Sequence, residues 1–174
     1  NDNENLELLS HRMSEKSANL IIDAVIKLQS IGIVPPNNRV SKLNMINQRD
    51  LPGEITYART IKKSDYQIDW NCSALDIHRK VRGLYPNAYS YWQGKRIKIV
   101  ETEVIDKKRI TEFNLQIQNF DSNMDDQTKP GKIKVCLKKY GILVHTKDSH
   151  ILIKQAQIEG KKISSKQTLI QQMG

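Results

Sequence analysis

The chain has 174 residues, a formal net charge of +9, and hydrophobic and charged shares of 38% and 27%. A chain of this length forms one domain with a real core plus an appendage, and is too short for two domains of ordinary size. It has no run of about 18 apolar residues, which excludes a membrane-spanning helix, and its polar, acidic start does not resemble a signal peptide. We expect a cytoplasmic protein, cut from inside a longer chain because it starts without Met.

The spacing of the cysteines and the distribution of charge limit the kinds of site and partner that we expect. Cys72 and Cys136 show no CxxC spacing and no clustered His or Asp around them, which argues against a zinc site and a disulfide framework. Residues 1–30 carry three basic and five acidic side chains, and the other 25 basic and 14 acidic side chains give residues 31–174 a net charge of +11. This surplus predicts a polyanionic partner.

The first predicted element is an amphipathic helix between Leu6 and Leu28, where apolar residues recur with the helical period. Gly32 and Pro35-Pro36 end it, because proline cannot continue the backbone hydrogen bonding. We expect the following domain or a second copy of the chain to cover the apolar stripe. The stripe consists of Leu6, Leu9, Met13, Leu20, Ile21, Ala24, Val25 and Leu28.

An irregular connection follows the helix. From Pro35 to Gly53 the sequence is rich in Asn, Pro, Arg and Gln and has only scattered apolar residues, which is typical of a linker that runs over the surface. The predicted domain boundaries are therefore residues 1–34 for the helix, 35–55 for the linker and 56–174 for a second domain.

The second domain contains a short helix. Ser73 precedes its apolar positions, and Asp76 follows three residues later in a variant of the capping box. The helix is predicted to end near Gly83. Its apolar stripe consists of Ala74, Ile77, Val81 and Leu84.

The remainder of this domain has the period of β-strands. Residues 88–92 and 96–100 alternate on either side of a turn at Gly94, which predicts a hairpin. Several short strands with one helix are typical of a barrel that protects its edges by closing. The fold class is therefore mainly β with α, a small oligonucleotide-binding-like open barrel preceded by a separate amphipathic helix. The three further strands are predicted at Lys132–Leu137, Ile142–Thr146 and Ile151–Ile158.

The sequence shows no catalytic or metal-binding cluster. Asp69 stands beside Trp70 without a second carboxylate nearby, so we expect Trp70 in the core and Asp69 on backbone amides. The histidines lack a close Asp, Glu, Ser or Cys at catalytic or ligand spacing. The four are His11, His78, His145 and His150.

Basic residues are the candidate binding groups. On the second helix, His78, Arg79 and Arg82 are spaced to share the side away from the apolar stripe. Such groups attract a phosphate backbone whatever its base sequence, although basic side chains also serve as ordinary solvated cover. Two more groups consist of Arg59 with Lys62 and Lys63, and of Lys95 and Arg96 with Lys98.

Aromatic residues interleave with the basic hairpin. They offer stacking surfaces for unpaired bases, or they fill the core, and the alternation assigns at least half of them to the core. These residues are Tyr85, Tyr89, Tyr91 and Trp92.

Several segments resemble one protein family. The segment from Ile68 to Val100, with Ile68-Asp69-Trp70 and Gly94-Lys95-Arg96, is similar to the start of the C-terminal domain of methionyl-tRNA formyltransferases. Residues 6–30 resemble the last helix of that family's catalytic domain, and Thr56-Tyr57-Ala58 resembles the passage between the domains. The closing element of the family resembles residues 158–164, which adds Lys161 and Lys162 to the candidate RNA contacts.

The resemblance implies a C-terminal barrel that helps to hold initiator Met-tRNA, and a separate N-terminal catalytic domain with 10-formyltetrahydrofolate as cosubstrate. The catalytic Asn, His and Asp of the family and its Ser-Leu-Leu-Pro segment have no counterpart in this sequence. We therefore expect part of a formyltransferase that is inactive alone and binds no cofactor. Its expected partners are initiator Met-tRNA, its own catalytic domain and, through the first helix, a second copy.

Two alternatives stay open. Sugar-nucleotide formyltransferases that act on UDP-amino-sugars share the Asp-Trp pattern, and their C-terminal domain would pack on the catalytic domain without binding RNA. The second alternative is an independent barrel that binds single-stranded nucleic acid, although such a protein would not need the first helix.

One segment departs from the family pattern. The chain has Pro86-Asn87-Ala88 where the family usually has Pro-Gly-Ala or Pro-Met-Ser, so we expect Asn87 at a positive φ.

Overall fold

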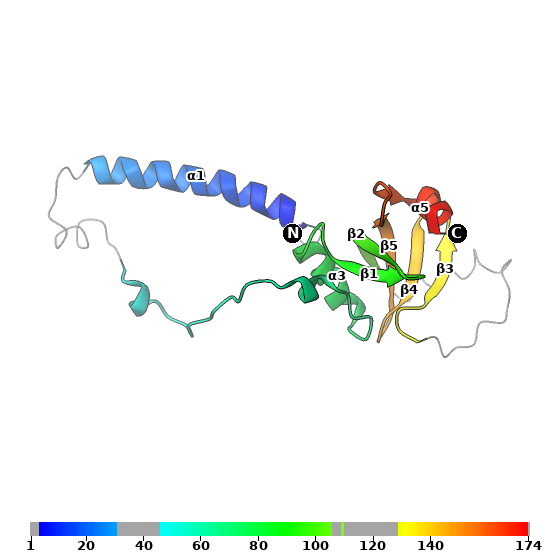
Figure 1. Ribbon diagram of the computed structural model, residues 1–174. Helices are drawn as coiled ribbons and strands as arrows, with labels where there is room; N and C mark the ends of the chain where they lie inside the picture. The colour runs from blue at the N-terminus through cyan, green and yellow to red at the C-terminus, as the bar shows by residue number, and fades with distance from the viewer. Residues whose placement is uncertain (1–3, 31–45, 106–108, 110–128, 174) are drawn as a thin grey trace. The chain divides into compact units, whose positions relative to one another are not determined.

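The computed structural model describes residues 4–30, 46–105, 109 and 129–173 (Figure 1). The chain divides into two compact units, one of Asn1–Leu6 with Lys62–Gly174 and the other of Glu7–Ile61. The first part of the expected linker, residues 35–45, lies outside the described residues. The long helix and the sheet therefore belong to different units.

The unit Glu7–Ile61 holds helix α1, Leu6–Ser30, except for its first residue, and one turn of 3-10 helix, η1, Gln48–Asp50. The helix predicted from the apolar period is confirmed. Every residue of α1 is exposed, so the expected burial of its stripe is not observed among the described residues. Large apolar side chains are also exposed outside the predicted stripe, at Leu8, Ile22 and Ile26.

The other unit is built on an antiparallel sheet with the strand order β1-β2-β5-β4-β3, to which β6 adds by pairing with β5. The sheet curls into an open half-barrel (Figure 1), which confirms the predicted fold class. Residues of one face of the sheet form the main core, and β4 and the first half of β5 are buried on both faces. The strands are β1 Tyr89–Trp92, β2 Lys95–Ile105, β3 Ile133–Leu137, β4 Gly141–His145, β5 His150–Ile158 and β6 Ser164–Ser165.

The predicted hairpin consists of β1 and β2. Gln93 and Gly94 connect the strands, and both have a positive φ, 49° and 76°. Two consecutive positive φ angles give a turn whose twist matches that of the flanking strands. This turn sets the register in which Tyr89 lies opposite Lys98 and Trp92 opposite Lys95.

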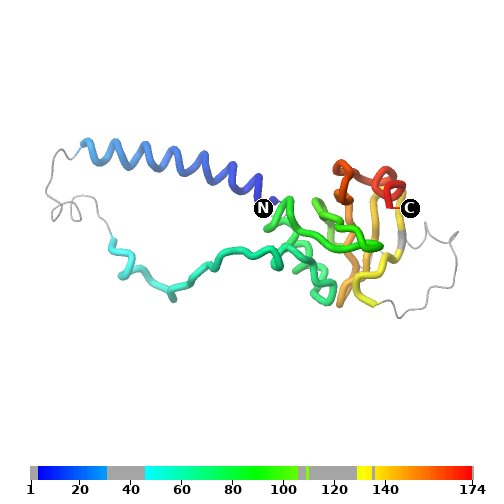
Figure 2. Tube along the Cα trace, viewed as in Figure 1, coloured from blue at the N-terminus to red at the C-terminus, as the bar shows by residue number. Residues whose placement is uncertain are grey.

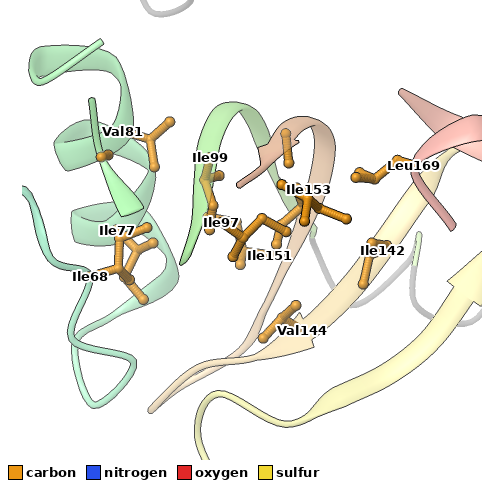
Figure 3. Packing of buried hydrophobic residues seen from close by; sticks show 13 residues of the cluster. Ile68, Ile77, Val81, Ile97, Ile99, Ile142, Val144, Ile151, Ile153 and Leu169 are labelled. Atoms are coloured by element: carbon orange, nitrogen blue, oxygen red, sulfur yellow. The ribbon is translucent and has the colours of Figure 1, made fainter. Parts of the chain in front are cut away.

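The main core lies between the inner face of the sheet and two helices, α3 Ala74–Gly83 and α5 Lys166–Met173 (Figure 3). Ile77 and Val81 of α3 belong to the same buried cluster as Ile99 of β2, as the apolar stripe predicted. Leu169 is the buried residue that α5 adds. Each fully buried aliphatic side chain of this kind stabilises the fold by roughly 1.5–3 kcal/mol relative to exposure.

Two residues hold the start of α3. Ser73 Oγ accepts a hydrogen bond from the Asp76 backbone N–H at 3.1 Å and donates to the Asp76 carboxylate at 2.7 Å, as the capping pattern predicted. Asp148, in the turn between β4 and β5, accepts a hydrogen bond from the Ala74 N–H at 2.9 Å. This bond is the main reason that the pKa of Asp148 lies below its ordinary value. The helix thus starts against the sheet, and its body packs on β2 (Figure 2).

The environment of Trp70 agrees with the expected core role. Its ring packs against the main core, and its Nε1–H donates to Ser90 Oγ at 2.9 Å. Asp69 accepts a hydrogen bond from the Asn71 N–H at 3.0 Å, which lowers the pKa of that carboxyl. Asp69 therefore holds a backbone amide, as expected.

The expected conformation of Asn87 is wrong. The described non-glycine residues with positive φ are Gln93 and Lys166, and Asn87 is not among them. Its N–H donates to the Leu84 carbonyl at 2.8 Å, so the turn is closed by a backbone hydrogen bond that needs no left-handed residue at this position.

Candidate nucleic-acid interface

The three candidate phosphate-binding residues of helix α3 lie in different environments. His78 is half-buried, and its Nδ1 lies 2.9 Å from Thr102 Oγ1 on β2. Burial, and then the charge of Arg82, lowers the pKa of His78, so this ring is mainly neutral near pH 7. Arg79 is exposed and Arg82 is half-buried. The expected trio of cationic donors is therefore a pair of arginines beside a neutral histidine.

A groove of about 830 Å³ runs between α3 and β2. We call it the helix groove; its polar lining includes His78, Arg79, Arg82, Glu101, Glu103 and Lys154. Beyond Lys98, β1 no longer pairs with β2, and the groove lies beside this part of the strand. Arg79 and Arg82 of α3 therefore line the helix groove.

Carboxylates line the opposite wall of the helix groove. Lys154 Nζ lies 2.6 Å from a Glu101 oxygen and 4.0 Å from a Glu103 oxygen, and Arg109 also pairs with Glu103. These cations compensate both negative charges locally. Sequence reasoning missed this wall, because Lys154 reaches Glu101 only through the pairing of β5 with β2; the one linear signal was the alternation of Glu101 and Glu103 along β2.

A second surface lies on the outer side of the β1–β2 hairpin. We call it the hairpin face; it consists of Tyr89, Tyr91, Arg96 and Lys98. Tyr91 lies opposite Arg96 and Tyr89 lies opposite Lys98, so the four side chains share one face. Lys95 lies opposite Trp92 on the other face, because neighbouring strand residues point to opposite sides. The pairing thus separates Lys95 from Arg96 and Lys98.

The rings and the cations of the hairpin face contact one another. The Arg96 guanidinium carbon lies 3.9 Å from the centroid of the Tyr89 ring, which is a cation–π contact. The rings of Tyr89 and Tyr91 meet edge to face, with centroids 5.7 Å apart and an interplanar angle of 87°. Of the predicted aromatic group, Trp92 packs against the core and Tyr85 lines the helix groove.

The helix groove and the hairpin face adjoin along β2, since Val100 lines the groove and Lys98 precedes it by two residues on the same strand. The basic residues of these surfaces are Arg79, Arg82, Arg96, Lys98 and Lys154. They come from three elements of one compact unit.

The other candidate cations lie elsewhere in the chain. Lys62 and Lys63 are exposed at the short helix η2, Lys63–Tyr66. Lys161 donates from Nζ to the Gln172 carbonyl at 3.1 Å, and Lys162 is exposed beside it. Arg59 belongs to the unit Glu7–Ile61.

The remaining histidines form no metal cluster with their neighbours. The rings of His145 and His150 are in contact, with centroids 4.3 Å apart and a tilt of 54° between their planes. Within the described residues, no group of three or more His, Cys, Asp or Glu side chains is placed to hold a metal ion. None of the described helices is long and apolar enough to cross a membrane.

Known proteins are similar to this chain in sequence. Residues 60–174 match the family described as formyl transferase, C-terminal domain. The methionyl-tRNA formyltransferase of Prochlorococcus marinus strain MIT 9303 is 37% identical over 171 residues, covering 98% of this chain and 50% of the relative. That of Synechococcus sp. strain RCC307 is 36% identical over 170 residues, covering 98% and 51%. The chain thus spans about half the length of the curated relatives it matches.

Solved structures with low sequence identity share the fold. Two variants of HypX from Aquifex aeolicus superpose with TM-scores of 0.59 and 0.55 at 12% identity. The superpositions cover 98% and 90% of this chain, and 26% and 23% of the HypX chain. The family match, which includes α3, the whole sheet and α5, is the stronger finding. By that match over residues 60–174, the chain belongs to the family of formyl transferase C-terminal domains.

Proposed function

We propose that this chain is the C-terminal part of a methionyl-tRNA formyltransferase and helps to hold initiator Met-tRNA while its amino group is formylated for translation initiation. The observation that carries the proposal is the adjoining pair of basic surfaces along β2, with Arg79 and Arg82 in the helix groove and Arg96 and Lys98 on the hairpin face. The proposed substrate, methionyl-tRNA, comes from the names of the curated relatives.

The chemistry of these side chains suits a folded nucleic acid. Arginine presents several N–H donors in a plane and remains charged at all ordinary pH values, so it binds phosphate oxygens with two parallel hydrogen bonds. Each phosphate that is neutralised releases condensed counterions, which makes affinity depend on salt. The ion-paired carboxylates of the opposite groove wall limit the number of phosphates that fit there. Binding by this chain alone is therefore expected to be weak.

Catalysis belongs to the rest of the protein in this proposal. The sequence contains no counterpart of the family's catalytic Asn, His and Asp, so we assign no catalytic role to any residue of this chain. A catalytic domain that precedes α1 would bind 10-formyltetrahydrofolate, and the barrel would present the tRNA to it in the cytoplasm. Helix α1 would pack on that domain, or on a second copy of the chain when the domain is absent.

The proposal predicts salt-dependent tRNA binding. Fluorescence anisotropy with labelled initiator tRNA, between about 50 and 200 mM salt, should give a slope of log affinity against log salt of magnitude about three or more. The double variant Arg79→Gln with Lys98→Gln removes one cation from each surface and should lower this magnitude by about two. Both affinity and slope report on the same contacts.

A matched control removes the same charge elsewhere. Lys138→Gln with Lys139→Gln changes two exposed residues in the turn between β3 and β4 and should leave the slope as in the wild type. Absent or salt-independent binding by the wild-type chain would refute the proposal and favour the sugar-nucleotide alternative. Equal loss in both double variants would show that net charge, and not these surfaces, attracts the tRNA.

A further inference from the structure

The hairpin face contains an aromatic ring that is more than half exposed. Tyr91 is 56% exposed, and its ring meets Tyr89 at an interplanar angle of 87°. In an edge-to-face contact only one of the two rings uses a face. At least one face of the Tyr91 ring is therefore not covered by Tyr89.

Arg96 is held in place beside this ring before any ligand arrives. Its guanidinium lies over the Tyr89 ring at 3.9 Å from the centroid, and its Nε is buried without a hydrogen-bond partner among the described residues. The nearby Glu159 carboxylate accepts a hydrogen bond from the Arg96 backbone N–H at 3.3 Å. The side chain is thus oriented by stacking on the ring, and a ligand would bind it with little further ordering.

Three chemical groups therefore stand together on β1 and β2: an open aromatic face at Tyr91, a fixed guanidinium at Arg96 and the ammonium of Lys98, which lies opposite Tyr89. An aromatic face accepts any nucleobase by stacking, and flanking cations bind the adjoining phosphates. In an RNA duplex both faces of every internal base are occupied by its neighbours. An unpaired nucleotide is therefore the favoured source of a base for Tyr91.

We propose that the hairpin face is a binding site for one unpaired nucleotide, whose base stacks on Tyr91 and whose phosphates lie at Arg96 and Lys98. This inference rests on the proposed tRNA-holding function and adds to it the structural feature of the RNA that is bound. The cations of the helix groove then bind duplex backbone. The two surfaces make different contributions to affinity and can be measured separately.

The experiment compares two RNA hairpins with the same duplex, both closed by a non-nucleotide linker so that neither has an unpaired loop, one blunt and one with a single-stranded 3′ extension of a few nucleotides. Wild-type chain should bind the extended hairpin about tenfold more tightly, in the range that stacking of one base contributes. Tyr91→Ala should abolish this difference and leave the affinity for the blunt hairpin unchanged. Tyr91→Phe keeps the ring and should preserve the difference, while Tyr57→Ala, at a tyrosine that is 91% exposed in the other unit, is the matched control.

A fluorescent base analogue in the extension gives a second readout. Its emission should be quenched by the wild-type chain and by Tyr91→Phe but not by Tyr91→Ala, because only a stacked base is quenched by the ring. An extension that adds no affinity to the wild type, or a difference that survives Tyr91→Ala, would overturn the nucleotide site while leaving tRNA binding intact. Failure to bind either hairpin would instead refute the proposed function, and this inference with it.

Discussion

At the scale of single residues, Gly141 is a position of the sheet where no side chain fits. It begins β4 with a φ of 139°, and a Cβ atom built on it would lie 2.1 Å from the Ile153 carbonyl oxygen. That oxygen belongs to the backbone of β5, the strand to which β4 is paired, so it cannot move without breaking the ladder. A side chain at this position is opposed both by backbone strain and by steric overlap.

The change Gly141→Ala is therefore expected to lower the free energy of unfolding by roughly 2–4 kcal/mol. Urea unfolding followed by tryptophan fluorescence measures the loss. The control is Gly83→Ala at the end of α3, where an added Cβ meets no atom within 4 Å. It should be neutral or stabilise the fold by up to about 1 kcal/mol, because alanine restricts the unfolded chain. Equal stabilities for the two variants would contradict the close approach of β4 and β5.

The residue scale also explains why His78 differs from its neighbours. Its ring is half-buried against Thr102, so desolvation favours the neutral form. Arg79, one position further along α3, is exposed and lines the groove. Adjacent positions of one short helix thus serve packing and binding, a division that follows from where β2 passes the helix.

At the scale of elements, the β4–β5 hairpin carries a pair of histidines whose rings are in contact. His145 lies opposite His150 in the ladder, and both ring nitrogens of His150 are buried without a hydrogen-bond partner among the described residues. Burial, followed by the positive charges of His145 and Lys134, lowers the pKa of His150 to about 4. The folded hairpin therefore favours the neutral ring, whereas the unfolded chain binds a proton near pH 6.5.

This difference predicts acid sensitivity. The contribution of His150 to stability is fully present above about pH 6.5 and decreases as the pH falls toward the folded pKa of about 4. His150→Phe cannot bind a proton, so its urea midpoint should fall less than that of the wild type over this window. His11→Asn changes an exposed residue of α1 and should retain the wild-type profile. Parallel profiles for wild type and His150→Phe would show that the pair is not the source of the sensitivity.

The hairpin β1–β2 shows how an element arranges a site. Because opposite residues of an antiparallel pair share a face, the register alone places Tyr91 with Arg96 and Tyr89 with Lys98. The same rule places Lys95 with Trp92 on the other face. A slip of one residue would exchange the two sets, so the turn at Gln93-Gly94 that fixes the register also fixes the composition of the hairpin face.

At the scale of the whole molecule, α1 is the element without a core. Its exposed apolar residues include the predicted stripe and also Leu8, Ile22 and Ile26, which stand on the opposite side of the helix. A helix that is apolar on most sides is normally enclosed by protein. This composition supports the proposal that α1 packs inside a larger domain, since the curated relatives are about twice as long as this chain.

Without that domain, the chain is expected to associate through α1. Sedimentation velocity should show dimers whose share increases with concentration, because a contiguous apolar surface is unfavourable in water. Leu20→Lys with Val25→Lys charges the stripe and should shift the equilibrium toward monomer. The control Asn19→Lys with Ser30→Lys adds the same charge at two positions that are already polar, so it removes no apolar surface and should have a smaller effect. A wild-type chain that remains monomeric at all concentrations would contradict this expectation.

Local sequence determined the elements of this protein and their buried faces. The helical period located α1 and α3, and the alternation beyond Pro86 located β1 to β5, because each pattern acts within one segment and depends on which side of it meets the core. The turn at Gly94 could be predicted from the sequence for the same reason. β2 continues to Ile105, beyond its predicted end at residue 100, and β6 was not predicted. The resemblance of short segments then indicated the family.

Tertiary structure alone decided which side chains meet across elements. The Asp148 bond to the start of α3, the Lys154–Glu101 pair opposite the α3 arginines and the burial of His78 all join residues far apart in the sequence. The Lys154–Glu101 pair depends on the register of β2 against β5, which is shifted by irregularities between Ile99 and Thr102. The sequence shows such a shift only as a break in the alternation at Ile99-Val100, where two consecutive residues are buried, and this break does not determine which residues of β5 then lie opposite β2.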